Sequence, residues 1–241
     1  MLLIIQNDQE VPPGNFTGTI NKLHVPYHIA HPYNRETLPQ VRDISAAIVL
    51  GGAMGVHDTA KHPFLVIVKE FIRECVQRET PFLGVCLGGQ LLAEILGGRV
   101  IADSPCAEKG TLTVTLTAKG GEDPLFSGIT RDFISFHWHN DSFKIPEGAI
   151  HLAFSAACSA QAFRFGPCAW GMQFHPEVDQ SIVANWASWE RETKPCADKF
   201  LADFSLKEKI YLEVSHRLLG NFLRLAGFTA RKKGGAGLEK P

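Results

Sequence analysis

Short apolar runs alternate with helix-like segments through the first hundred residues, and this alternation restricts the possible folds more than any other feature. Four of the runs have the length and composition of buried strands, at residues 2–6, 24–29, 46–50 and 81–85. Two segments between or after them have helical spacing, at residues 64–77 and 87–96. Strands that alternate with helices form parallel sheets covered on both faces. The sequence therefore predicts an α/β fold with a central, mostly parallel sheet and helices on both faces.

The pattern changes at Thr111, after which apolar or period-2 runs follow one another with few helical segments between them. These runs lie at residues 111–117, 133–138, 151–155, 161–165 and 169–174. They predict an antiparallel extension of the same sheet, followed by helices over 181–192 and 202–225. Trp186 and Trp189 fit the apolar stripe of the first of these helices, so we expect them in the core. We expect one domain over residues 1–228 and a disordered tail over 229–241, which lacks apolar periodicity.

Composition excludes several classes of partner. The formal net charge of −1 and the pI of about 6.8 provide no basic field to attract nucleic acid or an anionic membrane. No apolar window approaches the roughly 18 residues of a membrane span, and the N-terminal run is too short for a signal peptide. The six cysteines form no CxxC pair, which is typical of reduced thiols. We therefore expect a cytoplasmic protein with no membrane or nucleic-acid partner.

The segment from Phe82 to Gln90 places a nucleophilic side chain between an apolar strand and a helix. Cys86 follows the strand directly, with Gly84 and Gly88 two residues to either side. Such a corner lifts the side chain out of the sheet edge, and its glycines allow the chain to turn tightly. The N-terminus of the helix also favours the thiolate form. The segment indicates a catalytic cysteine, although a buried cysteine that packs beneath a helix has the same local sequence.

A second motif, Phe174-His175-Pro176-Glu177, follows another apolar strand. In an extended segment residues i and i+2 face the same side, and Pro176 disfavours helical geometry at His175. Glu177 is therefore expected to reach the imidazole and to set its tautomer. Together with the upstream Cys86, the pair is a candidate Cys-His-Glu triad.

These two motifs resemble the signatures of class I glutamine amidotransferases. The matching residues are Gly-Val-Cys-Leu-Gly-Gly-Gln at 84–90 and Phe-His-Pro-Glu-Val at 174–178, in the order that the family uses, and the resemblance covers roughly residues 44 to 180. It implies that family's flavodoxin-like fold. It also implies hydrolysis of the γ-amide of glutamine or of a γ-glutamyl compound through a cysteinyl thioester.

The resemblance further assigns an oxyanion hole. Residues 48–55 resemble the strand-end glycine loop that supplies one backbone N–H in this family. Carried over, the donors are the N–H groups of Gly52, or of its neighbour Ala53, and of Leu87. Ala53 and Gln90 are also expected to contact the substrate, since the family's glutamine at the position of Gln90 contacts its amino-acid end.

Residues 136–141 resemble the family's Ser-His-Gly-Asp segment, whose backbone holds the α-amino and α-carboxylate groups of the substrate. The resemblance therefore assigns Trp138, His139 and Asn140 to substrate binding. Trp138 replaces a small polar residue and agrees with a stand-alone subgroup, similar to the amidotransferase domain of GMP synthase, that carries Trp-His here. Asn140 replaces a glycine, which we expect to be tolerated because asparagine adopts positive φ more readily than most residues.

The residues His137 and His139 form a His-x-His pair that could place two nitrogens on one face of a strand, as in many metal sites. No suitably spaced third ligand is evident in the sequence, although His57, Asp58 and His62 on a nearby loop leave the idea open. The catalytic chemistry needs neither a metal nor a cofactor. We therefore predict no metal and no cofactor.

Other functional classes agree less well with the motifs. An α/β-hydrolase orders its triad as nucleophile, acid and base, whereas here His175 precedes Glu177. A cysteine hydrolase whose acid partner is a glutamate upstream of the cysteine would not need His-Pro-Glu. A catalytically silent amidotransferase-like binding protein stays open as an alternative, although the presence of all three triad residues argues against it. Two enzymatic hypotheses remain: a stand-alone γ-glutamyl hydrolase, and a glutaminase subunit that delivers ammonia to a separate synthetase. We expect the former, because the residues after Glu177 contain neither a second α/β pattern nor a phosphate-binding glycine loop.

Overall fold

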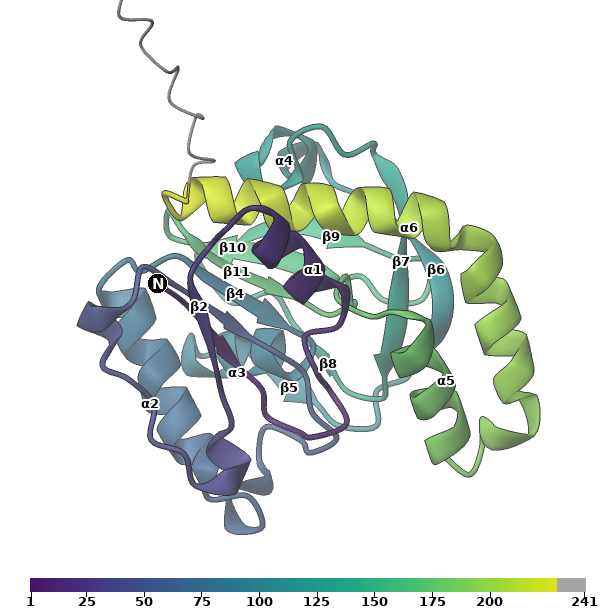
Figure 1. Ribbon diagram of the computed structural model, residues 1–241, viewed down its shortest axis with the longest axis horizontal. Helices are drawn as coiled ribbons and strands as arrows, with labels where there is room; N and C mark the ends of the chain where they lie inside the picture. The colour runs from purple at the N-terminus through teal and green to yellow at the C-terminus, as the bar shows by residue number, and fades with distance from the viewer. Residues whose placement is uncertain (229–241) are drawn as a thin grey trace, which may run out of the picture.

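One large sheet organises the computed structural model, which describes residues 1–228. Its nine strands have the order β2-β1-β3-β4-β11-β10-β9-β6-β7 (Figure 1). The first five in this order pair in parallel, namely β2 (Tyr27–Ala30), β1 (Leu2–Ile5), β3 (Ala46–Val49), β4 (Phe82–Val85) and β11 (Ala169–Met172). The remaining pairs are antiparallel, formed by β10 (Ala162–Phe165), β9 (Ile150–Phe154), β6 (Glu108–Leu116) and β7 (Asp132–His139). The predicted parallel sheet with an antiparallel extension is confirmed.

Helices cover both faces of this sheet. On one face lie α1 (Asn15–Lys22) and the long α6 (Ala197–Leu225), and on the other lie α2 (Phe64–Gln77) and α3 (Leu87–Ile95). Successive residues of β1 point to opposite faces, so that Leu2 and Ile4 enter one apolar core while Leu3 and Ile5 enter the other. This continuous burial explains why the strands appear in the sequence as unbroken apolar runs.

The smaller elements complete the chain. A separate antiparallel pair joins β5 (Val100–Ile101) to β8 (Ser142–Phe143), and two further helices are α4 (Ala118–Glu122) and α5 (Gln180–Trp189). Single 3₁₀ turns lie at Pro32–Asn34, Val41–Asp43, Asp58–Ala60, Pro124–Phe126 and Lys194–Cys196. Within residues 1–228, no helix has the length and apolarity that crossing a membrane requires.

Some boundaries differ from those expected. The strand predicted from residue 24 begins at Tyr27, because His24, with a φ of 54°, ends the turn that closes the preceding helix. The last helix begins at Ala197, five residues before its predicted start. The tail expected over 229–241 lies outside the described residues.

Helix α1 was not predicted, because threonine and glycine in its sequence have low helix propensity. Contacts from distant parts of the chain hold it in place. The side-chain amide of Asn15 donates to the carbonyls of Pro176 (3.0 Å) and Val178 (2.8 Å), and its backbone N–H donates to that of Glu177 (2.8 Å). Gly14, with a φ of 45°, lies so close that a methyl group there would be 2.1 Å from the Glu177 carbonyl oxygen. The start of α1 therefore holds the backbone around Glu177.

Candidate active site

The nucleophile candidate Cys86 lies at the junction of β4 and α3. Its φ of 51° and ψ of −109° are unusual for a residue with a side chain, and such geometry is concentrated at functional sites. Neighbouring glycines make the turn possible. A methyl group on Gly84 would lie 2.5 Å from the Gly88 carbonyl oxygen, and one on Gly88 would lie 2.1 Å from that of Val49. Larger residues at either position would force the strand and helix apart.

The imidazole of His175 lies just after β11 and is held from several sides. Its Nδ1 is 2.6 Å from Oε1 of Glu177, a fully buried carboxylate whose other oxygen has no hydrogen-bond partner among residues 1–228. The backbone N–H of His175 donates to the Phe136 carbonyl (2.7 Å), and the Tyr211 hydroxyl donates to the His175 carbonyl (3.0 Å). Because the carboxylate facing Nδ1 can only accept, Nδ1 carries the proton and Nε2 is the basic atom.

Electrostatics favour the charged imidazole. Burial opposes the imidazolium, but the carboxylate of Glu177 and the thiolate of Cys86 outweigh this and raise the pKa of His175 to about 10. The loop after β3 closes over the pair. A methyl group on Gly51 would lie 3.1 Å from Cε1 of His175 and 3.5 Å from Cβ of Cys86. These three residues, which come from different parallel strands, therefore converge at one end of the sheet, as expected for the carboxyl ends of parallel strands.

The geometry distinguishes the two oxyanion-hole candidates on this loop. The N–H of Ala53 donates to the Asp8 carboxylate at 3.1 Å. In contrast, the N–H groups of Gly52 and Leu87 have no acceptor among residues 1–228. Gly52 and Leu87 are thus the better pair to receive an oxyanion.

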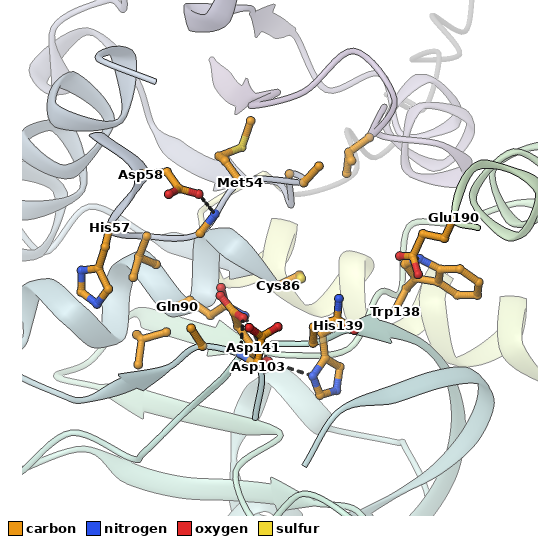
Figure 2. Close-up of a pocket in the computed structure, with 18 of the residues that line it drawn as sticks. Met54, His57, Asp58, Cys86, Gln90, Asp103, Trp138, His139, Asp141 and Glu190 are labelled. Atoms are coloured by element: carbon orange, nitrogen blue, oxygen red, sulfur yellow. Dashed lines mark hydrogen bonds between the residues drawn. The ribbon is translucent and has the colours of Figure 1, made fainter. Parts of the chain in front are cut away.

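A cleft of about 610 Å³ opens over Cys86 (Figure 2). It is lined by every residue to which a substrate-binding role was assigned, namely Ala53, Gln90, Trp138, His139 and Asn140. His175 and Gly52 also line it, whereas Leu87 and Glu177 lie behind its wall. In Figure 2 the loop that carries Met54 lies on one side of Cys86, and His139 and Asp141 lie on the other. A small molecule in this cleft would contact the thiol.

Sequence reasoning missed Gln173, which is fully buried beside the thiol. Its Nε2 lies 3.6 Å from Sγ of Cys86, and its Oε1 accepts a hydrogen bond from Nε2 of Gln90 (3.2 Å). Gln90 is itself buried, and its Nε2 also lies 3.4 Å from the Asp141 carbonyl oxygen. The available signal was a polar residue in the apolar run of residues 169–174, two positions before His175, where extended backbone would place both side chains on one face.

Replacing Gln173 with leucine is expected to slow alkylation of Cys86 by iodoacetamide about 10-fold at neutral pH, because a hydrogen bond to a charged group contributes about 1.5–3 kcal/mol. Intact-mass spectrometry would measure the rate. Gln77→Leu, at an exposed position on α2, is the matched control and should leave the rate unchanged. An unchanged rate in the Gln173 variant would show that its amide does not stabilise the thiolate.

Two expectations about residues near the triad, Trp189 and Asn140, are corrected by the structure. Trp186 is buried as expected, and its ring also packs edge-on against His175 with centroids 4.8 Å apart. Trp189 is not in the core: it is 54% exposed and lines the cleft, because α5 ends there. Asn140 does not adopt positive φ, so it replaces the glycine of the related motif without needing that conformation. The indole of Trp138 donates to the Glu190 carboxylate (2.8 Å), which fixes one wall of the cleft.

On the neighbouring strand, His137 and His139 do have an acidic neighbour. Glu108 on β6 pairs with His139 across the antiparallel β6–β7 ladder, and ligand atoms of the three residues lie within 4.8 Å of one another. The loop that suggested a third ligand contributes none to this group, since His57 lies 3.2 Å from the carboxylate of Glu94. Only the sheet register, which the sequence does not specify, brings Glu108 to this position.

The geometry can be compared with known families. The model of a family described as glutamine amidotransferase class-I matches residues 17–183. The chain belongs to the class I glutamine amidotransferase family. The match includes all three members of the candidate triad and the glycine loop opposite them. The amidotransferase fold predicted from the two motifs is thereby confirmed.

Individual relatives agree with this assignment. The glutamine amidotransferase-like protein YfeJ of Salmonella typhimurium is 33% identical over 155 residues, which are 63% of this chain and 64% of that protein, less than two thirds of its length. One subunit of the glutamine-hydrolyzing GMP synthase of Methanocaldococcus jannaschii is 32% identical over 152 residues, 62% of this chain and 73% of that protein. Among solved structures, a glutamine amidotransferase from Thermotoga maritima superposes with a TM-score of 0.84 at 27% identity, over 93% of this chain and 97% of that one.

Proposed function

We propose that this amidotransferase hydrolyses the γ-amide of glutamine or of a γ-glutamyl compound through a thioester on Cys86. One observation carries the proposal. A cysteine on a positive-φ elbow faces an imidazole whose Nδ1 is held 2.6 Å from a buried carboxylate, at the bottom of an open cleft. Nucleophile, base and orienting acid in this arrangement are the requirements for covalent acyl transfer.

In the first half of the reaction, the thiolate of Cys86 attacks the γ-carbonyl carbon of the substrate. The N–H groups of Gly52 and Leu87 stabilise the oxyanion, and donors of this kind contribute about 3 kcal/mol each to the transition state. The imidazolium of His175 then protonates the departing amine as the C–N bond breaks. A γ-glutamyl thioester remains on Cys86.

In the second half, neutral His175 accepts a proton from a water molecule that attacks the thioester. The C–S bond breaks, glutamate leaves, and the imidazolium again pairs with the thiolate. Glu177 stabilises the positive charge on His175 at both stages and does not itself accept a proton. No step consumes a nucleotide.

We also propose that the chain acts without a synthetase. The triad and two oxyanion donors that lack acceptors within residues 1–228 are already in place in this one chain, which supports activity in isolation. Purified protein should hydrolyse at least one member of a panel of γ-glutamyl amides and peptides at a rate on the order of 1 s⁻¹ or more, with no nucleotide present. Ammonia or amine release, followed by intact-mass detection of the acyl-enzyme, measures this.

A second candidate function follows from one comparison. The relative that is named as one subunit of a glutamine-hydrolyzing GMP synthase is 32% identical to this chain, which favours a glutaminase subunit that passes ammonia to a separate synthetase. In that case turnover by the isolated protein would stay negligible and would rise sharply when a synthetase from the same cell is added. That result would overturn the stand-alone proposal while leaving the thioester chemistry intact.

A further inference from the structure

Two ring nitrogens and a carboxylate meet in a closed space beside the active-site cleft. His137 Nδ1 lies 3.5 Å and His139 Nε2 lies 3.6 Å from Oε2 of Glu108, and His137 is fully buried. Within residues 1–228, neither nitrogen of His137 has a hydrogen-bond partner, and nor does Nε2 of His139. Buried polar atoms are normally satisfied, so two unpartnered nitrogens that face one carboxylate, Nδ1 of His137 and Nε2 of His139, require an explanation.

The hydrogen bond from His139 to a backbone carbonyl determines which of its ring nitrogens carries the proton. Its Nδ1 lies 2.9 Å from the backbone carbonyl oxygen of Asp141, which can only accept, so Nδ1 carries the proton. Whenever the ring carries only that proton, its Nε2 presents a lone pair toward the carboxylate of Glu108, 3.6 Å away. Two acceptors that face each other away from water repel, whereas a cation between them would be bound by both.

The distance of each histidine nitrogen from the Glu108 oxygen fits a shared metal ion, and all three ligand atoms lie within 4.8 Å of one another. Metal–nitrogen bonds of about 2.0–2.1 Å and metal–oxygen bonds of about 2.0–2.2 Å at tetrahedral angles place ligand atoms about 3.3–3.5 Å apart. The two observed histidine-to-glutamate separations are 3.5 and 3.6 Å. We propose that Glu108, His137 and His139 form a binding site for one divalent transition-metal ion of the zinc type, with a fourth position left for water.

The groups behind the ligands support this assignment. A metal-bound histidine usually donates its other ring N–H to a carbonyl, and a bound carboxylate is usually hydrogen-bonded. His139 has such a partner in the Asp141 carbonyl, whereas Nε2 of His137 has none within residues 1–228. Glu108 Oε2 accepts from the Ser155 hydroxyl (2.8 Å) and from Nε2 of Gln161 (2.6 Å). These contacts hold the carboxylate in one orientation toward the histidines.

The position of the site indicates what the ion does. His139 also lines the cleft, and Asp141 at the end of the same turn lies near Gln90 (Figure 2). An ion that ties β6 to the end of β7 would therefore fix the segment that faces the substrate. Its role is structural, since Glu108 and His137 are not among the residues that line the cleft and the triad chemistry uses none of the three ligands directly.

Co²⁺ titration of the full chain tests the site without measuring activity. The Cys86→Ser protein is used, so that the catalytic thiol cannot bind the ion. We expect one equivalent of Co²⁺, visible d–d absorption of a four-coordinate ion, and no thiolate-to-cobalt charge-transfer band. Zn²⁺ at about one hundred times its Kd should also raise the Tm by about 5 °C or more.

Two ligand variants and a matched control locate the ion. Glu108→Gln keeps the shape of the side chain but removes its charge, and His137→Gln removes a nitrogen ligand. Because loss of a supporting contact alone costs 10–100-fold in metal affinity, each variant should lose more than about 100-fold. His216→Gln, at an exposed position on α6, should bind as tightly as the parent protein.

Each outcome decides the proposal. It is overturned if the parent protein binds no ion, or if either ligand variant folds and retains full affinity. Should neither variant fold, zinc-edge X-ray absorption of the loaded Cys86→Ser protein replaces them, and fewer than two imidazole ligands would overturn the site. One equivalent of metal with two imidazoles, lost in whichever variant folds, would establish it.

Discussion

Replacing Cys86 with alanine is expected to abolish turnover of γ-glutamyl substrates, with a loss of at least about 10⁴-fold, because members of a triad act as a unit. The variant should also resist labelling by a diazo-ketone analogue of glutamine. Alanine deletes the only atom that forms the thioester, and the small side chain is compatible with the elbow. Product release and intact-mass analysis after labelling measure both effects.

The other cysteines supply the controls. Burial raises the pKa of Cys75 to about 12 and that of Cys158 to about 11, so neither is a thiolate at neutral pH. Cys75→Ala and Cys158→Ala should therefore keep labelling at Cys86. Labelling that persists in Cys86→Ala would place the nucleophile on another residue.

Replacing Glu177 with glutamine is expected to lower the turnover number by about 10² to 10⁴-fold and to leave the fold intact. A neutral amide cannot balance the charge on His175, and its NH₂ group can face Nδ1 and favour the wrong tautomer. The high pKa of His175 depends on this carboxylate and should fall in the variant. Steady-state kinetics and an NMR titration of His175 would follow the two effects.

Glu213→Gln is the matched control, because Glu213 is an exposed glutamate on α6. It should have wild-type turnover. If Glu177→Gln also had wild-type turnover, the catalytic role of the carboxylate 2.6 Å from the imidazole would be wrong. A large loss of activity together with a much lower Tm would instead indicate a structural role for this buried group.

Several features of the site were predictable because short segments encode them. The strand, the cysteine and the helix between residues 82 and 95 follow from an apolar run, paired glycines and helical spacing. The closeness of His175 and Glu177 follows from the i, i+2 geometry of extended backbone around Pro176. Such local rules do not depend on which strands are neighbours.

Contacts between distant segments were not predictable. Gln173 reaches Gln90 because β11 lies beside β4, and Asn15 holds the backbone of Glu177 because α1 packs on the face of the sheet beside the segment 176–178. Helix α1 shows this most clearly, since its sequence has weak helix propensity and long-range hydrogen bonds support it. The prediction that Trp189 lies in the core was wrong because apolar periodicity does not show where a helix ends relative to a cleft.

By itself, the sequence determined the α/β class, the parallel sheet with its antiparallel extension, and the family to which the chain belongs. Periodicity, glycine spacing and two short motifs carry that information, and all of them act within a few residues. Only the tertiary structure decided which residues share a cavity. The β6–β7 register places Glu108 opposite His139, and Ala53 rather than Gly52 donates to Asp8. These choices depend on strand order and register, which arise from packing the whole core, so no local pattern encodes them.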